Sequence, residues 1–475
     1  MIMPEMLNLE TAGLRRSARL QQNNASKSMS FTSILTKMCA FGIILASCMG
    51  PTYVLSTGQA AVNSFIHQCN VVNANFDNTL NAIPHMVFAA GKENNECYTF
   101  KDMLAQPDKC EFLEAMLKET AEHESRKHWS VVLRSTMPVG TKPIQAIWSF
   151  KRKRFPDGSL NKHKACLCAH GGMQQWGVNY WETYAPVVNW ISVRFLLIIA
   201  ELLKLETRTI DFVLAFPQAK LDVPVYMYVP AGMQLSEIPS GTHQMYILKL
   251  EKSLYGLKQA SANWYDMLRK ALEERGFHES NSDACVFLKK DMIVLVYVDD
   301  CILISTKNKI IEDFLASLSN GPENFIFTDE GKLDKYLGVE IQKHQEGNGF
   351  TLTQPFLIER ILQAASIDTR MTKSRPTPVV GPLLSRDTDG PSRKHEWKYR
   401  TLTGMLIYLQ QTSRPEISMA THQCARFNND PKLCHERAIK RICKYLLGTI
   451  DKGIIFEPDM TRGLECYVDA DFTGG

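Results

Sequence analysis

The chain has 475 residues, of which 45% are hydrophobic, and its 54 Lys and Arg against 50 Asp and Glu give a formal net charge of +4. This length predicts about three structural units, and the apolar fraction excludes wholesale disorder. A nearly neutral chain is not a histone-like protein, although local basic patches remain compatible with it. The 13 Cys include no C-x-x-C pair and match no zinc-ligand spacing, which favours reduced thiols in an intracellular protein over a disulfide scaffold.

Residues 1–95 show weak periodicity and many Asn, Ser and Thr, which predicts a partly disordered leader or linker. Their longest apolar run, Met38 to Gly50, has 13 residues and is followed by Pro51. A membrane-spanning helix needs about 20 apolar residues. A buried helix or a decayed stretch of sequence is therefore the better interpretation, and we expect no stable membrane association.

Order is predicted to begin near residue 97. The charged stretch 99–128 predicts one amphipathic helix, because apolar residues recur in it at helical spacing. Runs typical of β-strands follow at 130–133 and 147–150. The segment Phe155–Ser159 predicts a hairpin turn, because its Asp-Gly pair supplies the positive φ angles that such a turn requires.

A strongly apolar helix is predicted over 193–205, and it leads into a strand that contains Asp211. Another helix is predicted over 260–274. Within 292–305, two apolar runs flank a pair of Asp residues, a pattern typical of a buried hairpin with two carboxylates at its tip. The remaining expected elements are strands at 350–353 and 464–471, helices at 356–365, 399–412 and 435–447, and a linker at 375–393.

The pair Asp299-Asp300 is costly in an apolar hairpin, because adjacent like charges repel and each loses solvation. A divalent cation would remove that cost, and hard oxygen ligands suit Mg²⁺. The alternative is a polar turn in solvent, where Asp is common. Asp211, on another apolar strand, favours the metal interpretation. Together the three carboxylates could hold two ions about 3.5–4 Å apart, the arrangement that polymerases use.

Seven sequence motifs occur in the same order as in one known protein family, and with similar spacing. They include Tyr297-Val-Asp-Asp300, Ser253-Leu-Tyr-Gly-Leu-Lys-Gln-Ala260 with Asn263-Trp-Tyr265, Tyr184-Ala-Pro-Val-Val188, Val225-Tyr-Met-Tyr-Val-Pro230 and Tyr336-Leu-Gly-Val-Glu-Ile341. The chain from about Glu96 to Gly475 is similar to the reverse transcriptase of copia-type LTR retrotransposons, within a pol polyprotein. The resemblance does not extend to residues 1–95.

The resemblance implies an α+β fold, a right-hand polymerase with fingers, palm and thumb and a ferredoxin-like palm. It implies that residues 96–345 form the fingers and palm and that 346–455 form a thumb and connection-like region. Residues 456–475 would be the truncated start of an RNase H domain, with Asp469 at its first catalytic position. Because the other acidic residues of that site would lie beyond Gly475, we expect no RNase H activity.

The resemblance also implies the roles of single residues. Asp211, Asp299 and Asp300 match the catalytic, metal-binding positions for two Mg²⁺ or Mn²⁺ ions. Phe216 matches the steric gate that selects deoxynucleotides, although a core phenylalanine is the alternative. The expected nucleotide-binding residues are Phe216, Tyr255, Gly256 and Lys258, and the expected primer grip is Tyr336, Leu337 and Gly338. A solvated lysine at Lys258 and a plain buried strand at the grip are the alternatives.

A basic window surrounds the predicted hairpin that resembles the tip of the fingers. A charge run is usually a solvated face, but flanking aromatic residues and the downstream motifs favour contact with nucleic-acid phosphates. Such contacts give affinity without sequence preference. The expected nucleic-acid-binding residues are Lys151, Arg152, Lys153, Arg154, Lys162 and Lys164.

Cys166 and His170 depart from the family pattern, which carries Arg at both positions. Losing a guanidinium removes bidentate phosphate recognition, as in a decaying copy of an element. Two hypotheses therefore stay open. One is an RNA-directed DNA polymerase that transfers nucleotides to a primer 3′-hydroxyl. The other is a catalytically weakened remnant that still binds nucleic acid.

The expected partners are an RNA or DNA template-primer and dNTPs, with other pol or capsid products of the element as further partners. The expected location is intracellular, in cytoplasmic virus-like particles, with the nucleus as a further site.

Overall fold

The computed structural model describes residues 97–154, 160–239, 241–344, 349–459 and 461. The predicted leader, the turn Phe155–Ser159 and the strand at 464–471 with Asp469 lie outside the described residues. Within the described part of the chain, no helix is long and apolar enough to cross a membrane.

The first sheet consists of β1 (Cys97–Tyr98), β3 (Ala146–Arg154) and β4 (Leu160–Ala169) in the order β1-β3-β4. The pairing of β3 with β4 confirms the predicted hairpin strands. The single helix predicted over 99–128 is wrong, because α4 (Phe100–Leu104) ends before Pro107 and α5 (Lys109–Ser125) begins after it. Proline lacks the N–H that a continuous helix needs.

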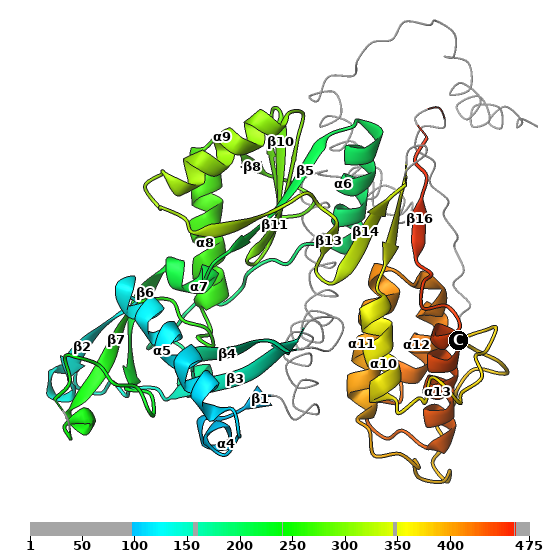
Figure 1. Cartoon of the computed structure of the whole chain (residues 1–475), viewed down its shortest axis with the longest axis horizontal. Helices are drawn as coiled ribbons and strands as arrows, with labels where there is room; N and C mark the ends of the chain where they lie inside the picture. The colour runs from blue at the N-terminus through cyan, green and yellow to red at the C-terminus, as the bar shows by residue number, and fades with distance from the viewer. Residues whose placement is uncertain (1–96, 155–159, 240, 345–348, 460, 462–475) are drawn as a thin grey trace, which may run out of the picture. The chain divides into compact units, whose positions relative to one another are not determined.

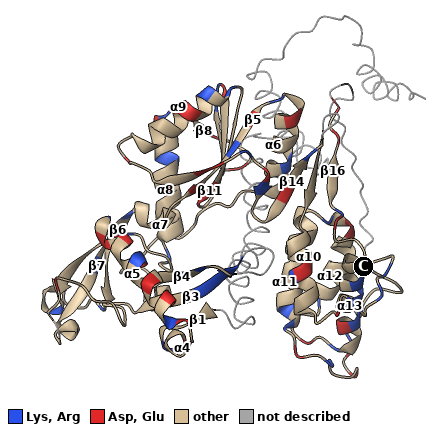
Figure 2. Ribbon diagram, in the orientation of Figure 1, with Lys and Arg blue, Asp and Glu red and all other residues tan. Residues whose placement is uncertain are grey.

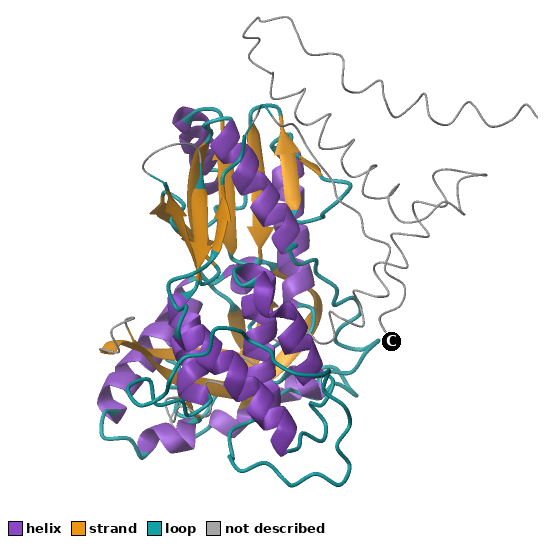
Figure 3. Ribbon diagram, turned by 90° about the vertical axis from the view of Figure 1, so that its right-hand side faces the viewer, coloured by secondary structure: helices purple, strands orange, loops and turns teal. Residues whose placement is uncertain are grey.

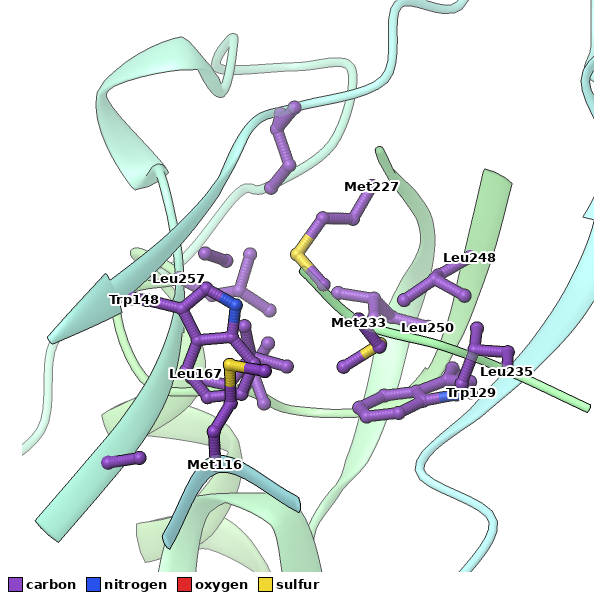
Figure 4. Packing of buried hydrophobic residues seen from close by; sticks show 14 of the residues in the cluster. Met116, Trp129, Trp148, Leu167, Met227, Met233, Leu235, Leu248, Leu250 and Leu257 are labelled. Atoms are coloured by element: carbon purple, nitrogen blue, oxygen red, sulfur yellow. The ribbon is translucent and has the colours of Figure 1, made fainter. Parts of the chain in front are cut away.

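A second three-stranded sheet has the order β2-β7-β6, from β2 (Trp129–Leu133), β6 (Lys220–Tyr228) and β7 (Tyr246–Lys252). It shares one apolar core with the first sheet and α5, and Figure 4 shows this packing. Buried residues from each sheet meet in that core, such as Trp148 on β3, Leu167 on β4 and Leu250 on β7. The period of two in a strand explains why one face of each strand is buried.

The largest sheet has six strands in the order β12-β5-β11-β10-β9-β8, and each neighbouring pair is antiparallel. Its strands are β5 (Glu206–Phe212), β8 (His278–Glu279), β9 (Val286–Lys289), β10 (Met292–Tyr297), β11 (Asp300–Ser305) and β12 (Phe327–Gly331). The helices near them in sequence are α6 (Trp190–Leu202), α7 (Ala215–Gln218), α8 (Ala260–Glu274) and α9 (Asn308–Ser319). Along the chain β5, α8, β10, β11, α9 and β12 follow one another as β-α-β-β-α-β, once α7 and β6 to β9 are left aside (Figure 1).

The helices α8 and α9 cover one face of this sheet. Their apolar residues, such as Trp264 and Phe314, form a cluster with Phe212 of β5 and Leu303 of β11. The bounds of α8 match the predicted helix 260–274, and β10 with β11 confirms the predicted hairpin.

The fourth sheet has the order β13-β14-β15-β16, and a cluster of four helices comes between β15 and β16 along the chain. Figure 3 colours the helices purple and the strands orange. Its strands are β13 (Lys335–Tyr336), β14 (Val339–Lys343), β15 (Phe350–Thr353) and β16 (Ile454–Phe456). The cluster combines α10 (Pro355–Ala364), α11 (Tyr399–Thr412), α12 (Ser418–Ala425) and α13 (Leu433–Leu447) around a common core. Short 3₁₀ turns lie at Arg134–Thr136, Gly171–Met173, His243–Met245 and Pro415–Ile417.

The predicted strand 350–353 and the three predicted helices of this region are confirmed at or within two residues of their bounds, and α12 is an additional helix. The expected linker 375–393 contributes no helix or strand apart from an isolated bridge at Ser392. Because β14 pairs with β15 and β15 with β16, this sheet draws strands from both sides of the expected boundaries near 345 and 455. The division of the chain into domains stays a prediction.

Candidate active site

The pairing of β5 with β11 places two of the three expected carboxylates side by side. Asp211 lies directly opposite Asp300 in the antiparallel register. Their neighbours Phe212 and Cys301 are buried on the face covered by α8 and α9. Because successive residues of a strand point to opposite faces, Asp211 and Asp300 share the other face of the sheet.

Asp299 lies in the two-residue turn that joins β10 to β11. The backbone N–H of Phe212 donates to the carbonyl of Asp299 at 2.9 Å, which ties this turn to the end of β5. The other turn residue, Val298, has φ 56°, a strained conformation for a β-branched side chain. The buried Trp264 donates its indole N–H to the Val298 carbonyl at 2.6 Å and so holds the turn in place.

The three carboxylates are electrostatically unfavourable when they are ionised together. Burial raises the pKa of Asp300 to about 7, with further contributions from Asp299, Asp211 and Glu330. Burial likewise raises the pKa of Asp211 and of Asp299. Lys164 opposes the shift at both of these groups, and Lys153 opposes it at Asp211. A divalent cation would relieve this repulsion, so the donor set fits Mg²⁺ or Mn²⁺.

Glu330 is a fourth acidic residue that the sequence reasoning missed. It lies on β12, which pairs with β5, and the register shifts between Asp329 and Gly331, so that Glu330 is the extra residue of a β-bulge. Bulges redirect side chains at the edges of sites. Its position on a strand with no recognised motif gave no sequence signal. Among the described residues, no group of three or more His, Cys, Asp or Glu side chains is already arranged as a metal cage.

We expect the metal-free protein to become less stable as the pH rises from about 4 to about 7. The folded-state pKa of Asp300 lies above its ordinary value of 3.8, so the folded protein binds this proton more tightly than the unfolded chain. Deprotonation therefore removes up to about 4 kcal/mol of stability, and the loss is complete above the folded-state pKa. Urea unfolding in chelator at pH 5 and pH 8 measures the effect. In Asp300→Asn, the free energy of unfolding should change less between pH 5 and pH 8. An unchanged pH dependence in that variant would refute the assignment to Asp300.

Phe216 and Tyr255 form a pair of rings beside the carboxylates. Their centroids are 5.0 Å apart, and both side chains are half-buried. Burial raises the pKa of Tyr255, and the nearby Asp299 raises it further. Phe216 follows Leu214, whose φ of 50° turns the chain sharply after β5. Phe216 also packs against the edges of two apolar cores, so it is partly a core residue, as the alternative interpretation held.

Gly256 lies at a very close contact between two backbone segments. Its φ is 89°, and a Cβ added there would lie 2.2 Å from the carbonyl oxygen of Ala169. A Cβ at Gly171 would lie 2.1 Å from the carbonyl oxygen of Gly256. The N–H of Ala169 donates to the carbonyl of Tyr255 at 2.7 Å. Only glycine combines this φ with this close approach.

Lys258 lies on the surface next to Tyr180. Its Nζ donates to the Tyr180 hydroxyl at 3.0 Å and lies 4.5 Å from the centre of that ring. Below it, the buried amides of Gln174 and Gln259 both donate to the carbonyl of Asn179. Neither amide was expected from the sequence to have a role, although Gln259 lies inside a recognised motif.

Four of the six expected nucleic-acid-binding residues share one face of the β3–β4 ribbon. Lys151 is paired with Lys164, and Lys153 with Lys162, so all four exposed lysines point the same way. Figure 2 shows this basic end of the ribbon. Arg152 points to the other face, where Asp108 holds its guanidinium at 2.6 Å and Tyr98 and Gln106 also bind it.

Cys166 and His170 occupy the two positions where arginines were expected. Cys166 lies on the lysine-bearing face of β4, with its Sγ 3.8 Å from that of Cys168. His170 is exposed at the end of β4, next to the close contact at Gly171. Neither side chain can replace a guanidinium in binding phosphate.

The expected primer grip is a tight turn between β13 and β14. Leu337 and Gly338 both have positive φ, at 49° and 76°, as a two-residue type I′ turn requires. The Tyr336 hydroxyl reaches the carbonyl of Asp300 at 3.5 Å, and Tyr408 of α11 donates to the carbonyl of Leu337 at 2.5 Å. A pocket of about 230 Å³ extends from this turn to Asp300 and Glu330, and its lining also includes Lys335 and Tyr336.

The model of the family described as reverse transcriptase (RNA-dependent DNA polymerase) matches residues 126–379, more than half of the chain. The chain therefore belongs to the reverse transcriptase family, and its mixed α/β architecture is that of a polymerase fold.

The similar proteins place the chain among transposon sequences. It is 29% identical over 404 residues to the retrovirus-related Pol polyprotein from transposon TNT 1-94 of Nicotiana tabacum. The aligned region is 82% of this chain and 29% of that protein. It is 36% identical over 332 residues to the retrovirus-related Pol polyprotein from transposon RE1 of Arabidopsis thaliana. That region is 69% of this chain and 22% of the relative. The chain thus spans less than a third of the length of these relatives. The motif-based recognition of a retrotransposon reverse transcriptase is confirmed.

Proposed function

We propose that this chain is an RNA-directed DNA polymerase of a copia-type retrotransposon, which adds deoxynucleotides to a primer 3′-hydroxyl by two-metal nucleotidyl transfer. The observation that carries the proposal is the register that sets Asp211 opposite Asp300, with Asp299 in the adjoining turn. Carboxylates that repel one another on a shared sheet face suit metal-assisted phosphoryl transfer. The proposal also rests on membership of the reverse transcriptase family.

We also propose that the six-stranded sheet is the palm of a right-hand polymerase. Without α7, β8 and β9, its strands and helices follow the order β-α-β-β-α-β. The strand order β12-β5-β11-β10, with α8 and α9 on one face, supports a ferredoxin-like arrangement. The β3–β4 ribbon then belongs to the fingers, and α10 to α13 to the thumb and connection.

The chain's own residues perform three tasks in this proposal. The lysines of the β3–β4 ribbon, above all Lys153 and Lys164, neutralise substrate phosphates near the carboxylates. The Phe216 ring, held by Tyr255, lies under the sugar and excludes a 2′-hydroxyl. The turn at Leu337 and Gly338 positions the primer end against the face that carries Asp300.

The residues that hold Mg²⁺ or Mn²⁺ in this proposal are Asp211, Asp299 and Asp300. When bound, two such ions activate the 3′-hydroxyl and neutralise the triphosphate. Mg²⁺ keeps several waters and usually completes its shell with substrate phosphates, so a partial carboxylate set fits it.

The partners proposed with this function are an RNA or DNA template-primer and dNTPs. Other pol or capsid products are further proposed partners, because the related proteins are polyproteins. We further propose an intracellular location in cytoplasmic virus-like particles, with the nucleus as a second site.

Primer extension tests the proposal directly. The whole chain is incubated with poly(rA)/oligo(dT), dTTP and Mg²⁺ or Mn²⁺, alongside Asp211→Asn and the control Asp334→Asn. Asp334 is an exposed carboxylate outside the cluster. Extension by the wild type and the control, but not by Asp211→Asn, is the expected result. Equal extension by all three proteins would rule out the catalytic assignment.

A second candidate function is a nucleic-acid-binding remnant with weakened catalysis. The observation that favours it is the position of Cys166 on the same face as Lys164, where the family's arginine could have reached phosphate. We expect the double substitution Cys166→Arg with His170→Arg to lower the KM for dTTP about tenfold, because each guanidinium offers a charge-assisted, bidentate contact to phosphate. Steady-state extension at varied dTTP measures this. Extension that begins only after the substitution would favour the remnant, and an unchanged KM would show that neither position contacts the triphosphate.

A further inference from the structure

Two tryptophans stand exposed on one turn that the proposed catalytic machinery does not use. The side chain of Trp176 is 70% exposed and that of Trp181 is 52% exposed, and their rings meet edge to face with centroids 5.8 Å apart. Val178 between them is also exposed. Large aromatic surfaces are costly to leave in water, and a contiguous exposed patch marks an interaction site.

The turn that carries these rings is firmly held. The N–H of Gly177 donates to the carbonyl of Tyr180 at 3.0 Å, and Trp176 forms a β-bridge with Tyr180. The side chain of Asn179 accepts from the N–H of Gln175 at 2.7 Å. The backbone carbonyl of Asn179 accepts a hydrogen bond from the buried side-chain amide of Gln259 at 2.9 Å. A ligand that binds the rings therefore orders little additional chain, which favours affinity.

The charge beside the patch indicates the class of ligand. Lys258, between β7 and α8, is exposed and sits over the Tyr180 ring, so a positive charge lies beside this turn. Glu182 is also close in sequence, but its carboxylate accepts the N–H groups of Thr183 and Tyr184 at 2.8 Å. A flat apolar partner with an anionic backbone matches both the rings and the lysine.

Hydrogen bonds that join Gln174, two residues before the patch, to Lys258 and Gln259 tie the patch to the segment that carries proposed nucleotide-binding residues. Gln259, which anchors the turn, lies four residues after Tyr255, and the tilted rings of Tyr255 and Phe216 pack together near Asp299 and Asp211. In a duplex the base faces are already stacked on one another, whereas an unpaired base offers its face to an aromatic side chain. We propose that Trp176 and Trp181 form a stacking platform for unpaired bases of the template strand ahead of the primer end. This inference rests on the proposed polymerase function.

The test compares binding of two fluorescent duplexes to the full chain at one fixed salt concentration, without dNTPs. One duplex is blunt, and the other carries a 5′ template overhang of about six nucleotides, near the site size of single-strand binding modules. We expect Trp176→Ala with Trp181→Ala to weaken binding of the overhanging duplex about tenfold and to leave blunt binding unchanged. Trp176→Phe with Trp181→Phe should retain most of the overhang preference, because a phenyl ring still stacks.

Matched controls separate stacking from charge and from general loss of structure. Leu117→Ala removes another exposed apolar side chain, on α5, and should change neither affinity. An overhang of abasic nucleotides keeps the phosphates but lacks the bases, so wild-type protein should bind it like the blunt duplex. An overhang preference that survives in the double Ala variant would overturn the platform. So would an equal loss for both duplexes, or a change in oligomeric state alone, which would point to a protein partner.

The failure of this inference can be told from the failure of the proposed function. If the wild-type chain extends primers but the double Ala variant keeps the overhang preference, the polymerase assignment stands and the platform is refuted. If the wild-type chain does not extend primers but its overhang preference depends on the two tryptophans, the stacking of unpaired bases stands and the polymerase assignment is refuted.

Discussion

Asp299→Asn is expected to lower the rate of primer extension at least about a thousandfold, equivalent to about 4 kcal/mol of transition-state stabilisation. Asparagine keeps the shape of the turn residue but removes the negative charge from one of the three proposed metal-binding carboxylates. The backbone carbonyl that accepts from Phe212 is unaffected, so the turn should persist. Rates are compared at saturating Mg²⁺ and dTTP on poly(rA)/oligo(dT).

The same substitution should make the metal-free protein more stable. Burial raises the pKa of Asp299, and its charge also raises the pKa of Asp300 and of Asp211. Removing that charge should increase the free energy of unfolding at pH 8 by on the order of 1 kcal/mol. Urea unfolding in chelator measures it, with Asp334→Asn as the control. A variant that lost both activity and stability would indicate misfolding in place of a missing ligand.

Gly256→Ala is the second substitution with a very large expected effect. The new Cβ would lie 2.2 Å from the carbonyl oxygen of Ala169 while the backbone keeps a φ of 89°. Strain at such a φ costs about 1 kcal/mol or more, and the clash requires two hydrogen-bonded backbone segments to separate. We expect a loss of at least about 4 kcal/mol, within the range of the most damaging single substitutions. The midpoint of urea unfolding reports this loss.

Gly140→Ala is the matched control for that experiment. Gly140 has a φ of 86°, but nothing lies within 4 Å of the position its Cβ would take. It therefore isolates the cost of the backbone angle, about 1 kcal/mol, from the cost of the clash. Equal destabilisation by the two substitutions would show that the contact with Ala169 relaxes freely.

The elements that the sequence predicted well are those with a strong local pattern. The amphipathic run 260–274 and the apolar runs around Asp299 carry their own periodicity, so their structures needed no knowledge of distant partners. The helix expected over 99–128 failed at Pro107, a signal that was present in the sequence but was outweighed by the apolar spacing.

The candidate site was predictable only in part, because some of its members are defined by pairing between distant strands. Glu330 enters the site through a bulge opposite β5, and no local motif marks it. The different situation of Arg152 could have been found from the sequence. A period of two along β3 separates Arg152 from Lys151 and Lys153, whereas counting the charges of the window treated all of them as equivalent.

The register between β5 and β11 also has a consequence for how the protein folds. It joins Asp211 to Asp300, roughly ninety positions apart in the sequence, and the intervening chain builds two strands of another sheet before it returns. Contacts of such separation close late, after the loop entropy has been offset by local structure. During synthesis, the carboxylates therefore cannot meet until the strands and helices between them have left the ribosome, so no shorter nascent chain can assemble the sheet face that carries them.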